Sequence, residues 1–342
     1  MRMMVTDRPP VTVIGAGIIG LWQAFELVRR GFPVTLREGV SATSTGAASR
    51  FAGAMLAPFC EAESAPPIVK TLGQRGLALW RAHYPGTVAR GTLVVTAKRD
   101  RVELERFARL TEGHGSMDVA DIAALEPDLS SRFDQALFYP DEGHVAPRRA
   151  LAFLIEVLWD LGVELRFNDP VASPVWMAGE AGGVVFDCRG IAARGALQGL
   201  RGVRGEMAVV RAKDVRLSRP IRLLHPRFPL YVVPWGRSRY MLGATMLEAL
   251  DASPVNVASA LHLVGAACAL HEGFGNAELL ELSSCIRPAF PDNVPTILAR
   301  GRRLIINGAY RHGDLLAPAL AELVAKHLEH GVSGSEVFRT NK

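Results

Sequence analysis

The sequence predicts an α/β fold in which a domain with a parallel sheet is interwoven with an α+β domain built on a mainly antiparallel sheet. Three observations lead to this prediction. A glycine-rich turn at residues 15–20 joins an apolar run to a helical segment. Similar strand and helix patterns return near the middle and the end of the chain, and strand-like segments lie between them. We therefore expect residues 1–82, 144–205 and 286–342 to form the first domain, and residues 83–143 and 206–285 the second.

Composition excludes several classes of protein. The chain has 342 residues, of which 49% are hydrophobic and 21% are charged, so it can bury a large core. The net charge is +5, and the basic residues are scattered as pairs, which disfavours nucleic-acid binding. Four cysteines without a CxxC pair and nine dispersed histidines disfavour a metal site. The N-terminus lacks the apolar core of a signal peptide, and no stretch is apolar enough to span a bilayer, so we expect a soluble cytoplasmic protein.

The first elements form a complete βαβ unit. Residues 11–14 predict a strand, residues 21–31 (LWQAFELVRRG) have apolar residues at helical spacing, and residues 33–38 (PVTLRE) predict a second strand. Ser253 and Pro254 predict the N-cap and first position of a later helix. The other expected helices cover residues 71–84, 100–112, 150–161 and 315–328, and the other strands residues 91–98, 162–167, 183–188, 303–307 and two runs within 221–245.

Gly15, Gly17 and Gly20 form a GxGxxG motif between the first strand and the first helix. The first glycine allows the tight turn, the second lets a pyrophosphate approach the backbone, and the third lets helix and strand pack closely. The helix N-terminus at Ile18 and Ile19 offers free N–H groups to the phosphates. The motif therefore predicts a Rossmann-like dinucleotide site.

Glu38 ends the second strand, eighteen residues after Gly20. A carboxylate at this place can accept hydrogen bonds from ribose hydroxyls and would repel a 2′-phosphate, which argues against NADP. The motif and its acid do not distinguish FAD from NAD.

Later segments carry a family resemblance. The segment STGAASRFAGAMLAP (44–58) resembles the flavin-contacting loop of the D-amino-acid oxidase family of FAD-dependent oxidoreductases. RPxxPDxxP, GATM and YRHGxLLAP are typical of its glycine oxidase branch, which serves thiamine biosynthesis. Further segments fit the family in order along nearly the whole chain: residues 141–167, 184–190, 230–246, 286–297 and 307–328.

The resemblance implies an FAD-binding domain of the D-amino-acid oxidase and glutathione-reductase type, and a substrate-binding domain. It implies an oxidase that transfers a hydride from glycine or a related small amine to flavin. The products are an imine (glyoxylate and ammonia for glycine) and hydrogen peroxide from dioxygen. A homo-oligomer is compatible with it. Three alternatives stay open: an oxidase or dehydrogenase of D-amino acids or of N-alkyl amino acids such as sarcosine, an NAD-dependent dehydrogenase, and a flavin-binding protein without turnover.

The resemblance also points to four residues at the substrate. Arg287, in the sequence IRP, matches the family's carboxylate-binding arginine. A guanidinium suits this role, since it can donate two parallel hydrogen bonds to a carboxylate. Tyr231 matches a tyrosine that donates its hydroxyl to the same group, although a core aromatic is the alternative. Arg311 matches an arginine near the flavin and the pocket. Met246 either lines the pocket or packs in the core.

The expected flavin contacts come from small residues and from a second helix N-terminus, whose partial positive charge would stabilise anionic reduced flavin. Beyond the GxGxxG motif and Glu38 they are Ala47, Ala48, Ala54, Met55, Gly190, Gly308, Arg311, His312, Gly313, Asp314 and Leu315. No metal ligand is expected.

The sequence departs from the family pattern at three positions. Arg189 replaces a small or hydroxyl residue, Trp235 replaces a basic residue, and Asp314 replaces an apolar residue near the expected flavin edge. These departures bear on substrate preference rather than on flavin binding.

Overall fold

The chain divides into two units, each assembled from segments that are far apart in the sequence. Unit 1 comprises residues 1–52, 147–203 and 287–342, and unit 2 comprises residues 53–146 and 204–286. The computed structural model describes residues 8–42, 46–172 and 183–339 of the chain. The chain crosses between the units four times, and two of these crossings fall within strands β10 and β14.

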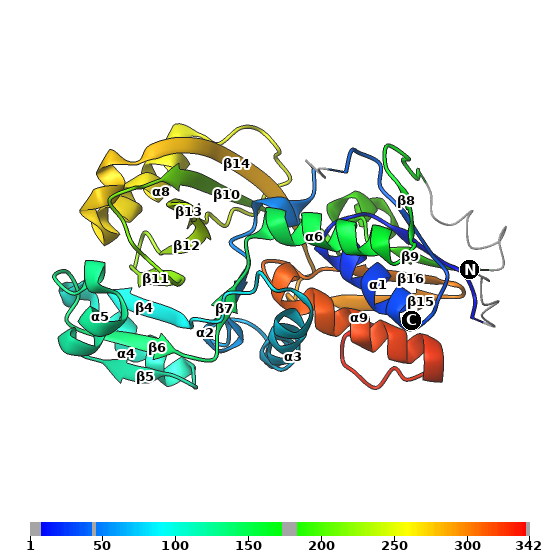
Figure 1. Cartoon of the computed structure of the whole chain (residues 1–342), viewed down its shortest axis with the longest axis horizontal. Helices are drawn as coiled ribbons and strands as arrows, with labels where there is room; N and C mark the ends of the chain where they lie inside the picture. Colours follow the sequence, from blue (N-terminus) through cyan, green and yellow to red (C-terminus); the bar gives the residue numbers. More distant parts are fainter. Residues whose placement is uncertain (1–7, 43–45, 173–182, 340–342) are drawn as a thin grey trace. The chain divides into compact units, whose positions relative to one another are not determined.

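Unit 1 is built on a seven-stranded sheet of order β17-β15-β16-β9-β1-β2-β8 (Figure 1). Strands β16, β9, β1, β2 and β8 run parallel, and β15 runs antiparallel to β16. The strands are β1 Val11–Ile14, β2 Val34–Arg37, β8 Glu164–Arg166, β9 Val184–Asp187, β15 Thr296–Arg300, β16 Arg303–Asn307 and β17 Phe338–Arg339.

The central helix of unit 1 is α1 (Ile18–Arg29), which packs against α9 (Gly313–His330) and α6 (Pro147–Asp160). Its residues from Gly20 to Leu27 are all buried, because helices cover it on more than one side. Two short 3₁₀ helices complete the unit, η1 (Ala48–Phe51) and η4 (Gly190–Ala196).

Unit 2 is built on an eight-stranded sheet of order β14-β10-β13-β12-β11-β4-β6-β5. Most neighbouring strands run antiparallel, and β4 and β11 run parallel. The strands are β4 Thr92–Thr96, β5 Gly115–Met117, β6 Ala136–Tyr139, β10 Arg201–Arg211, β11 Ile221–Leu224, β12 Leu230–Gly236, β13 Arg239–Gly243 and β14 Glu278–Ala289. A separate two-stranded sheet pairs β3 (Met55–Leu56) with β7 (Gly143–His144).

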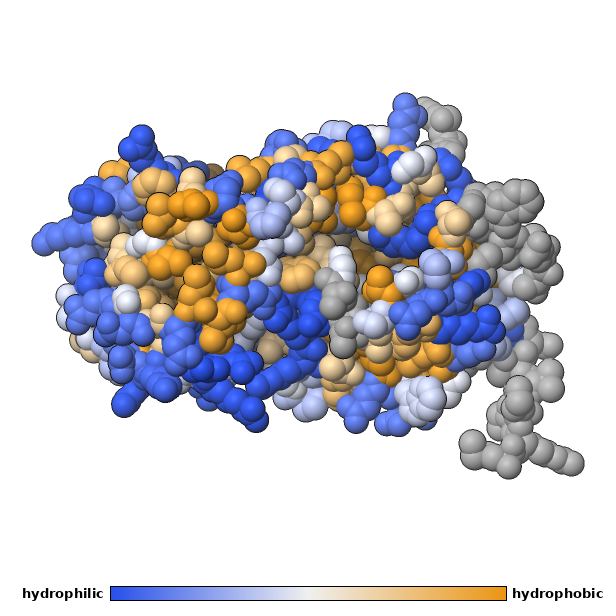
Figure 2. Space-filling model, turned by 90° about the horizontal axis from the view of Figure 1, so that it is seen from above, coloured by the Kyte–Doolittle hydropathy of each residue, from blue (hydrophilic) through white to orange (hydrophobic). Residues whose placement is uncertain are grey.

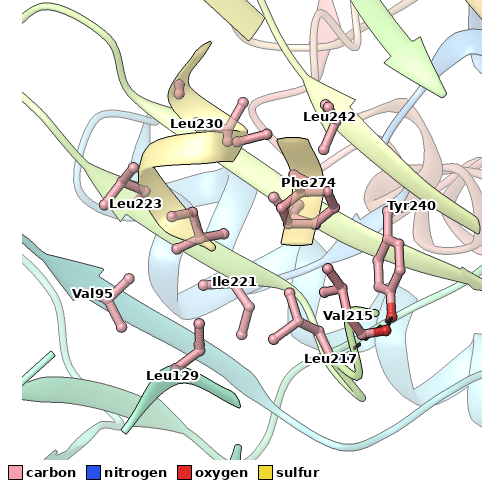
Figure 3. Close-up of a cluster of buried hydrophobic side chains, with 14 of the residues drawn as sticks. Val95, Leu129, Val215, Leu217, Ile221, Leu223, Leu230, Tyr240, Leu242 and Phe274 are labelled. Atoms are coloured by element: carbon pink, nitrogen blue, oxygen red, sulfur yellow. Dashed lines mark hydrogen bonds between the residues drawn. The ribbon is translucent and has the colours of Figure 1, made fainter. Parts of the chain in front are cut away.

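The helices of unit 2 surround this sheet. They are α2 Pro58–Glu61, α3 Pro67–His83, α4 Arg101–Leu110, α5 Val119–Leu125 and α8 Val257–Leu270, with 3₁₀ helices η2 Lys98–Asp100, η3 Pro127–Leu129 and η5 Glu272–Asn276. A core of buried hydrophobic side chains, aliphatic and aromatic, joins the sheet to α8 and η5 (Figure 3). Within it the Tyr240 hydroxyl donates to the Val215 carbonyl oxygen at 2.6 Å, so the polar end of this buried ring is satisfied.

Exposed apolar side chains of unit 2 lie on α8 and on β14, the edge strand of the sheet: Val257, Leu261, Leu279, Leu280 and Leu282. Figure 2 shows apolar residues at several places on the surface of this unit. In the described part of the chain, every helix is too short or too polar to span a bilayer.

The structure differs from the sequence predictions in two places. Residues 53–82 belong to unit 2 rather than to the expected first domain, because β3 pairs with β7 and because Phe59 N and Cys60 N donate to Glu142. The expected cap at Ser253 is wrong: α8 begins at Val257, and the Asn256 side chain accepts a hydrogen bond from Ser259 N at 2.9 Å. The Ser253 hydroxyl is engaged elsewhere, with Asp251 and Arg204.

Candidate active site

The carboxyl ends of the parallel strands in unit 1 form the edge where a nucleotide is expected. Strand β1 lies between β2 and β9, so the strand order reverses beside β1, and ligands of open α/β sheets bind at such a point. Helices α1 and α9 both begin there. A Cβ on Gly313 would lie 3.6 Å from Ile18 Cγ2, so the two helix N-termini are adjacent. Together they offer backbone N–H groups and partial positive charge at one place.

The three glycines of the motif differ in how much room the structure leaves for a side chain. A Cβ on Gly15 would lie 2.7 Å from the Cys188 carbonyl oxygen, and one on Gly20 would lie 1.8 Å from the Gly15 carbonyl oxygen. Backbone packing therefore requires both. A Cβ on Gly17 would meet only Ser49 Oγ and Ala47 Cβ, at 3.7 and 3.9 Å. Packing within the protein therefore does not require glycine at position 17, and glycine there lets a pyrophosphate such as that of FAD approach the backbone.

The Glu38 carboxylate lies at the same turn. Its Oε2 accepts from Ala16 N at 2.7 Å, and its Oε1 accepts from Val40 N at 3.3 Å. These bonds hold the carboxylate beside the glycine motif, where it can also accept hydrogen bonds from ribose hydroxyls.

The segment after Gly46 covers the start of α1. Ala47 precedes η1, and Ala48 begins it. The Ser49 hydroxyl accepts from Ile18 N at 3.2 Å. Sequence analysis missed Ser49, although a hydroxyl within the small-residue loop was a usable signal. Ser44, in the same predicted loop, lies outside the described residues.

Asn307 links two further glycine turns of unit 1, at Gly190 and at Gly308. Both have positive φ, +58° and +76°, which favours glycine. Asn307 Nδ2 donates to the Gly190 carbonyl oxygen at 2.9 Å, and Asn307 Oδ1 accepts from Gly308 N at 2.8 Å. Asn307 is thus a positioning residue that sequence analysis did not select.

The segments that carry Arg287 and Arg311 lie side by side in unit 1. Ala289 forms an antiparallel bridge with Ala309, and Tyr310 N donates to the Pro288 carbonyl oxygen at 3.0 Å. Arg287 is buried, with 9% of its surface exposed. The backbone therefore brings two predicted arginines to the loop that leads into α9.

The first turn of α9 carries the remaining predicted flavin contacts. His312 is the N-cap residue, and Gly313, Asp314 and Leu315 follow it. Burial raises the pKa of Asp314 to about 7, although a hydrogen bond with backbone acts to lower it. A carboxyl group that is partly protonated near neutral pH can donate a hydrogen bond, which a carboxylate cannot.

In unit 2 the ring of Tyr231 lies against two glycines. A Cβ on Gly53 would be 2.6 Å from Tyr231 Cε2, and one on Gly243 would be 2.7 Å from Cε2 and Cζ. Gly243 is the cross-strand partner of Tyr231. Ala54, with φ of +50°, and Met55 in β3 follow Gly53 directly. The structure thus brings Tyr231 to the segment predicted to contact flavin.

Met246 and the three departures have distinct surroundings. Met246 is 51% exposed, so the core-packing alternative is wrong. Arg189 forms an ion pair with the buried Asp187, from Nε to Oδ1 at 2.9 Å, and Trp235 is buried in β12. Arg189 therefore has a structural partner within its own turn. Among the described residues, His, Cys, Asp and Glu side chains form no group of three that could hold a metal ion.

The chain is similar to known oxidoreductases over nearly its whole length. It is 49% identical over 322 residues to a protein of Rhizobium etli named "Putative thiamine biosynthesis oxidoreductase ThiO", with 93% of this chain and 96% of that protein covered. It is 25% identical over 358 residues to a glycine oxidase of Geobacillus kaustophilus, with 95% and 94% covered.

Solved structures agree with these relatives. The crystal structure of the Geobacillus kaustophilus glycine oxidase superposes with a TM-score of 0.80 at 25% identity, covering 97% of each chain. The family model described as FAD dependent oxidoreductase (DAO) matches residues 10–327. The chain therefore belongs to the DAO family of FAD-dependent oxidoreductases, and its cofactor is FAD.

Proposed function

We propose that this enzyme oxidises glycine and related small amines or amino acids to imines, reduces dioxygen to hydrogen peroxide, and serves the biosynthesis of the thiamine thiazole. The names of the two relatives above support this assignment. The observation that carries it is Arg287, a buried arginine at the end of β14, on a segment paired with the loop that leads into α9. As part of the proposal, the protein acts in the cytoplasm on a free small molecule.

Each proposed site residue has a chemical task. Arg287 binds the substrate carboxylate through two parallel hydrogen bonds. The Tyr231 hydroxyl donates to a carboxylate, and its ring is held by Gly53 and Gly243. Met246 presents an exposed apolar side chain suited to a small substrate. Arg311 and the N-terminus of α9 supply positive charge.

When bound, FAD would supply the hydride acceptor for the substrate α-carbon and the electrons that reduce dioxygen. The N-terminus of α1 and Gly17 would hold its pyrophosphate, and Glu38 would hold a ribose. No side-chain base is assigned, because an amine that binds in its neutral form needs none. Water then converts the imine from glycine to glyoxylate and ammonia.

The first test is the visible spectrum of the purified protein, followed by anaerobic addition of glycine. We expect flavin absorbance that bleaches with glycine. Bleaching by sarcosine or D-alanine but not by glycine would move the substrate to the N-alkyl or D-amino acids. A yellow protein that none of these reduces would overturn the proposed activity.

Arg287→Met tests the carboxylate site. We expect KM for glycine to rise about a hundredfold with flavin content unchanged, because a charge-assisted bidentate contact contributes roughly 3 kcal/mol. Arg300→Met, at an exposed arginine of unit 1, is the matched control and keeps the wild-type KM. An unaltered KM in Arg287→Met would contradict the assignment.

A further inference from the structure

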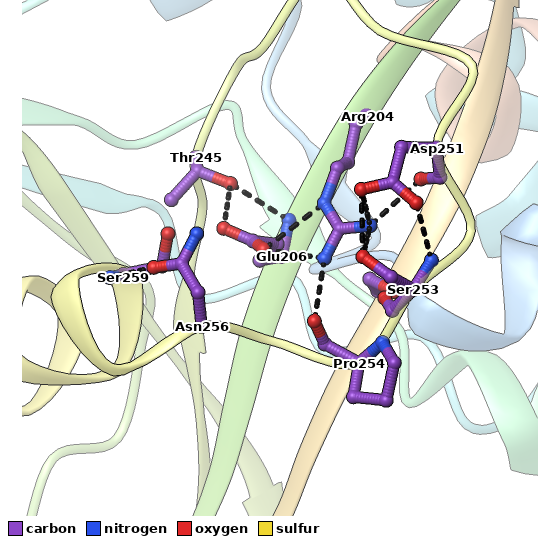
Figure 4. A network of polar contacts seen from close by, with 9 residues as sticks. Arg204, Glu206, Thr245, Asp251, Ser253, Pro254, Asn256 and Ser259 are labelled. Atoms are coloured by element: carbon purple, nitrogen blue, oxygen red, sulfur yellow. Dashed lines mark hydrogen bonds and ion pairs between the residues drawn. The ribbon is translucent and has the colours of Figure 1, made fainter.

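A segment of unit 2 that follows β13 is held by two buried charged side chains of β10 (Figure 4). Arg204 and Glu206 are 3% and 0% exposed. Glu206 Oε1 accepts from Arg204 Nε and Nη2 at 3.0 and 2.7 Å. The segment, residues 245–254, contains no helix, and an isolated bridge between Leu247 and Arg204 is its only strand-like pairing among the described residues.

The ion pair binds this segment at both ends. Glu206 Oε2 accepts from Thr245 Oγ1 at 3.0 Å, and Thr245 Oγ1 accepts from Glu206 N at 3.0 Å. Arg204 Nη1 donates to the Asp251 carbonyl oxygen at 2.7 Å, and Arg204 Nη2 donates to the Pro254 carbonyl oxygen at 3.0 Å. The Thr245 hydroxyl is thus used as both donor and acceptor toward one residue.

Thr245 is close in the chain to the candidate substrate residues. Gly243, two residues earlier, lies opposite Tyr231 in the β12–β13 register and against its ring. Met246, one residue later, is exposed. A shift of Thr245 would therefore disturb the end of β13 that lies against Tyr231, and with it the adjoining residue Met246.

The chemistry of the network favours positioning over stability. A buried ion pair adds little net stability compared with apolar residues of the same volume, because desolvation offsets its attraction. Its hydrogen bonds are directional, however, and they determine where an irregular segment lies.

We propose that Thr245, Glu206 and Arg204 are positioning residues for substrate binding, which hold the end of β13 so that Tyr231 and Met246 face the substrate. This inference rests on the proposed function. Because the network acts through geometry at the carboxylate site, its loss weakens binding of any small carboxylate.

Thr245→Val tests the inference, because it removes the hydroxyl and retains the shape. We expect KM for the reducing substrate to rise about tenfold, kcat to fall less, and the Kd for acetate, read from the flavin spectrum, to rise by a similar factor. Thr245→Ser keeps the hydroxyl and restores both values to within about twofold. A tenfold change corresponds to about 1.4 kcal/mol, which the loss of the two hydrogen bonds of the Thr245 hydroxyl can supply.

Thr96→Val is the matched control. Thr96 is a buried threonine of the same sheet, whose hydroxyl donates to the Leu224 carbonyl oxygen at 3.2 Å. It loses thermal stability without a change in KM or in the acetate Kd. If Thr245→Val behaves like Thr96→Val, the positioning role is wrong. If no amine reduces the wild-type flavin, the proposed function fails, and the acetate titration still decides the positioning role.

Discussion

Both units contain glycines at which a side chain would clash, but the clashing atoms differ: they belong to the main chain in unit 1 and to an aromatic ring in unit 2. In unit 1, Gly15 and Gly20 leave space for main-chain atoms of the β1–α1 turn and of the turn after β9. In unit 2, Gly53 and Gly243 leave space for the side chain of Tyr231. A main-chain atom cannot move without disturbing the strands and helices around it, whereas an aromatic ring can shift. We therefore expect the same change, glycine to alanine, to affect folding in unit 1 and substrate binding in unit 2.

Buried carboxylates of the two units differ in a similar way. In unit 1, burial acts to raise the pKa of Asp187, but hydrogen-bonded ion pairs with Arg189 and Arg303 outweigh it and hold the pKa below its ordinary value. In unit 2, burial raises the pKa of Glu142 to about 7, although hydrogen bonds from Cys60 act to lower it. Glu142 Oε1 accepts from Phe59 N and Cys60 N, at 2.9 and 2.7 Å, in the first turn of α2. Hydrogen bonds from neutral donors leave this carboxylate costly to ionise.

The largest effect is expected for Gly20→Ala. The added Cβ would lie 1.8 Å from the Gly15 carbonyl oxygen, so the β1–α1 turn must open. We expect a loss of more than about 3 kcal/mol in the free energy of unfolding, and little FAD retained. Thermal denaturation and flavin content measure this. Gly17→Ala is the control, because its Cβ has ordinary contacts, and it keeps the stability of the FAD-free protein. Equal stability of the two variants would contradict the claim that packing requires glycine at position 20 but not at position 17.

Glu142→Gln tests whether the raised pKa of Glu142 makes the stability of the protein depend on pH. The folded-state pKa of about 7 lies above the ordinary value of 4.5, so the folded protein binds more protons between these values and loses stability as pH rises through them. Glutamine removes this titration and can still accept from Phe59 N and Cys60 N. We expect the variant to gain up to about 3 kcal/mol relative to wild type between pH 5 and pH 8.

Denaturant unfolding at a series of pH values measures this gain. Glu105→Gln, at an exposed glutamate of α4, is the control and shows no such trend. A gain that does not depend on pH would contradict the assignment of the titration to Glu142.

Gly53→Ala has the smallest expected effect. Its Cβ would lie 2.6 Å from Tyr231 Cε2, and the ring can yield, so we expect a folded yellow protein whose KM for glycine rises about tenfold. Steady-state kinetics measure the rise. In a Tyr231→Ala background the same change adds little, because the clashing ring is gone. Additive effects in the double variant would show that Gly53 does not act through Tyr231.

Parts of the structure with strong local signals agreed with the sequence. The β1–α1–β2 unit follows from an apolar run, a GxGxxG turn and helical spacing, and each element lies within a few residues of its expected place. Start positions were less predictable: α1 begins inside the glycine motif, and α8 is capped by Asn256 rather than by Ser253, because Ser253 bonds to Asp251 and Arg204. A polar side chain next to a helix can cap that helix or bond to another part of the chain, and its tertiary partners decide which of these it does.

By itself, the sequence indicated the two kinds of sheet through local periodicities, and it indicated the family and FAD through motifs that resemble those of known family members. Only the tertiary structure decided which residues meet: Ser49 at the start of α1, Asn307 between two glycine turns, Thr245 on Glu206, and Tyr231 on Gly53 and Gly243. It also decided the charge of buried carboxyl groups. Such pairs are separated by tens or hundreds of residues, and desolvation and hydrogen bonding act only where folding has brought the groups together.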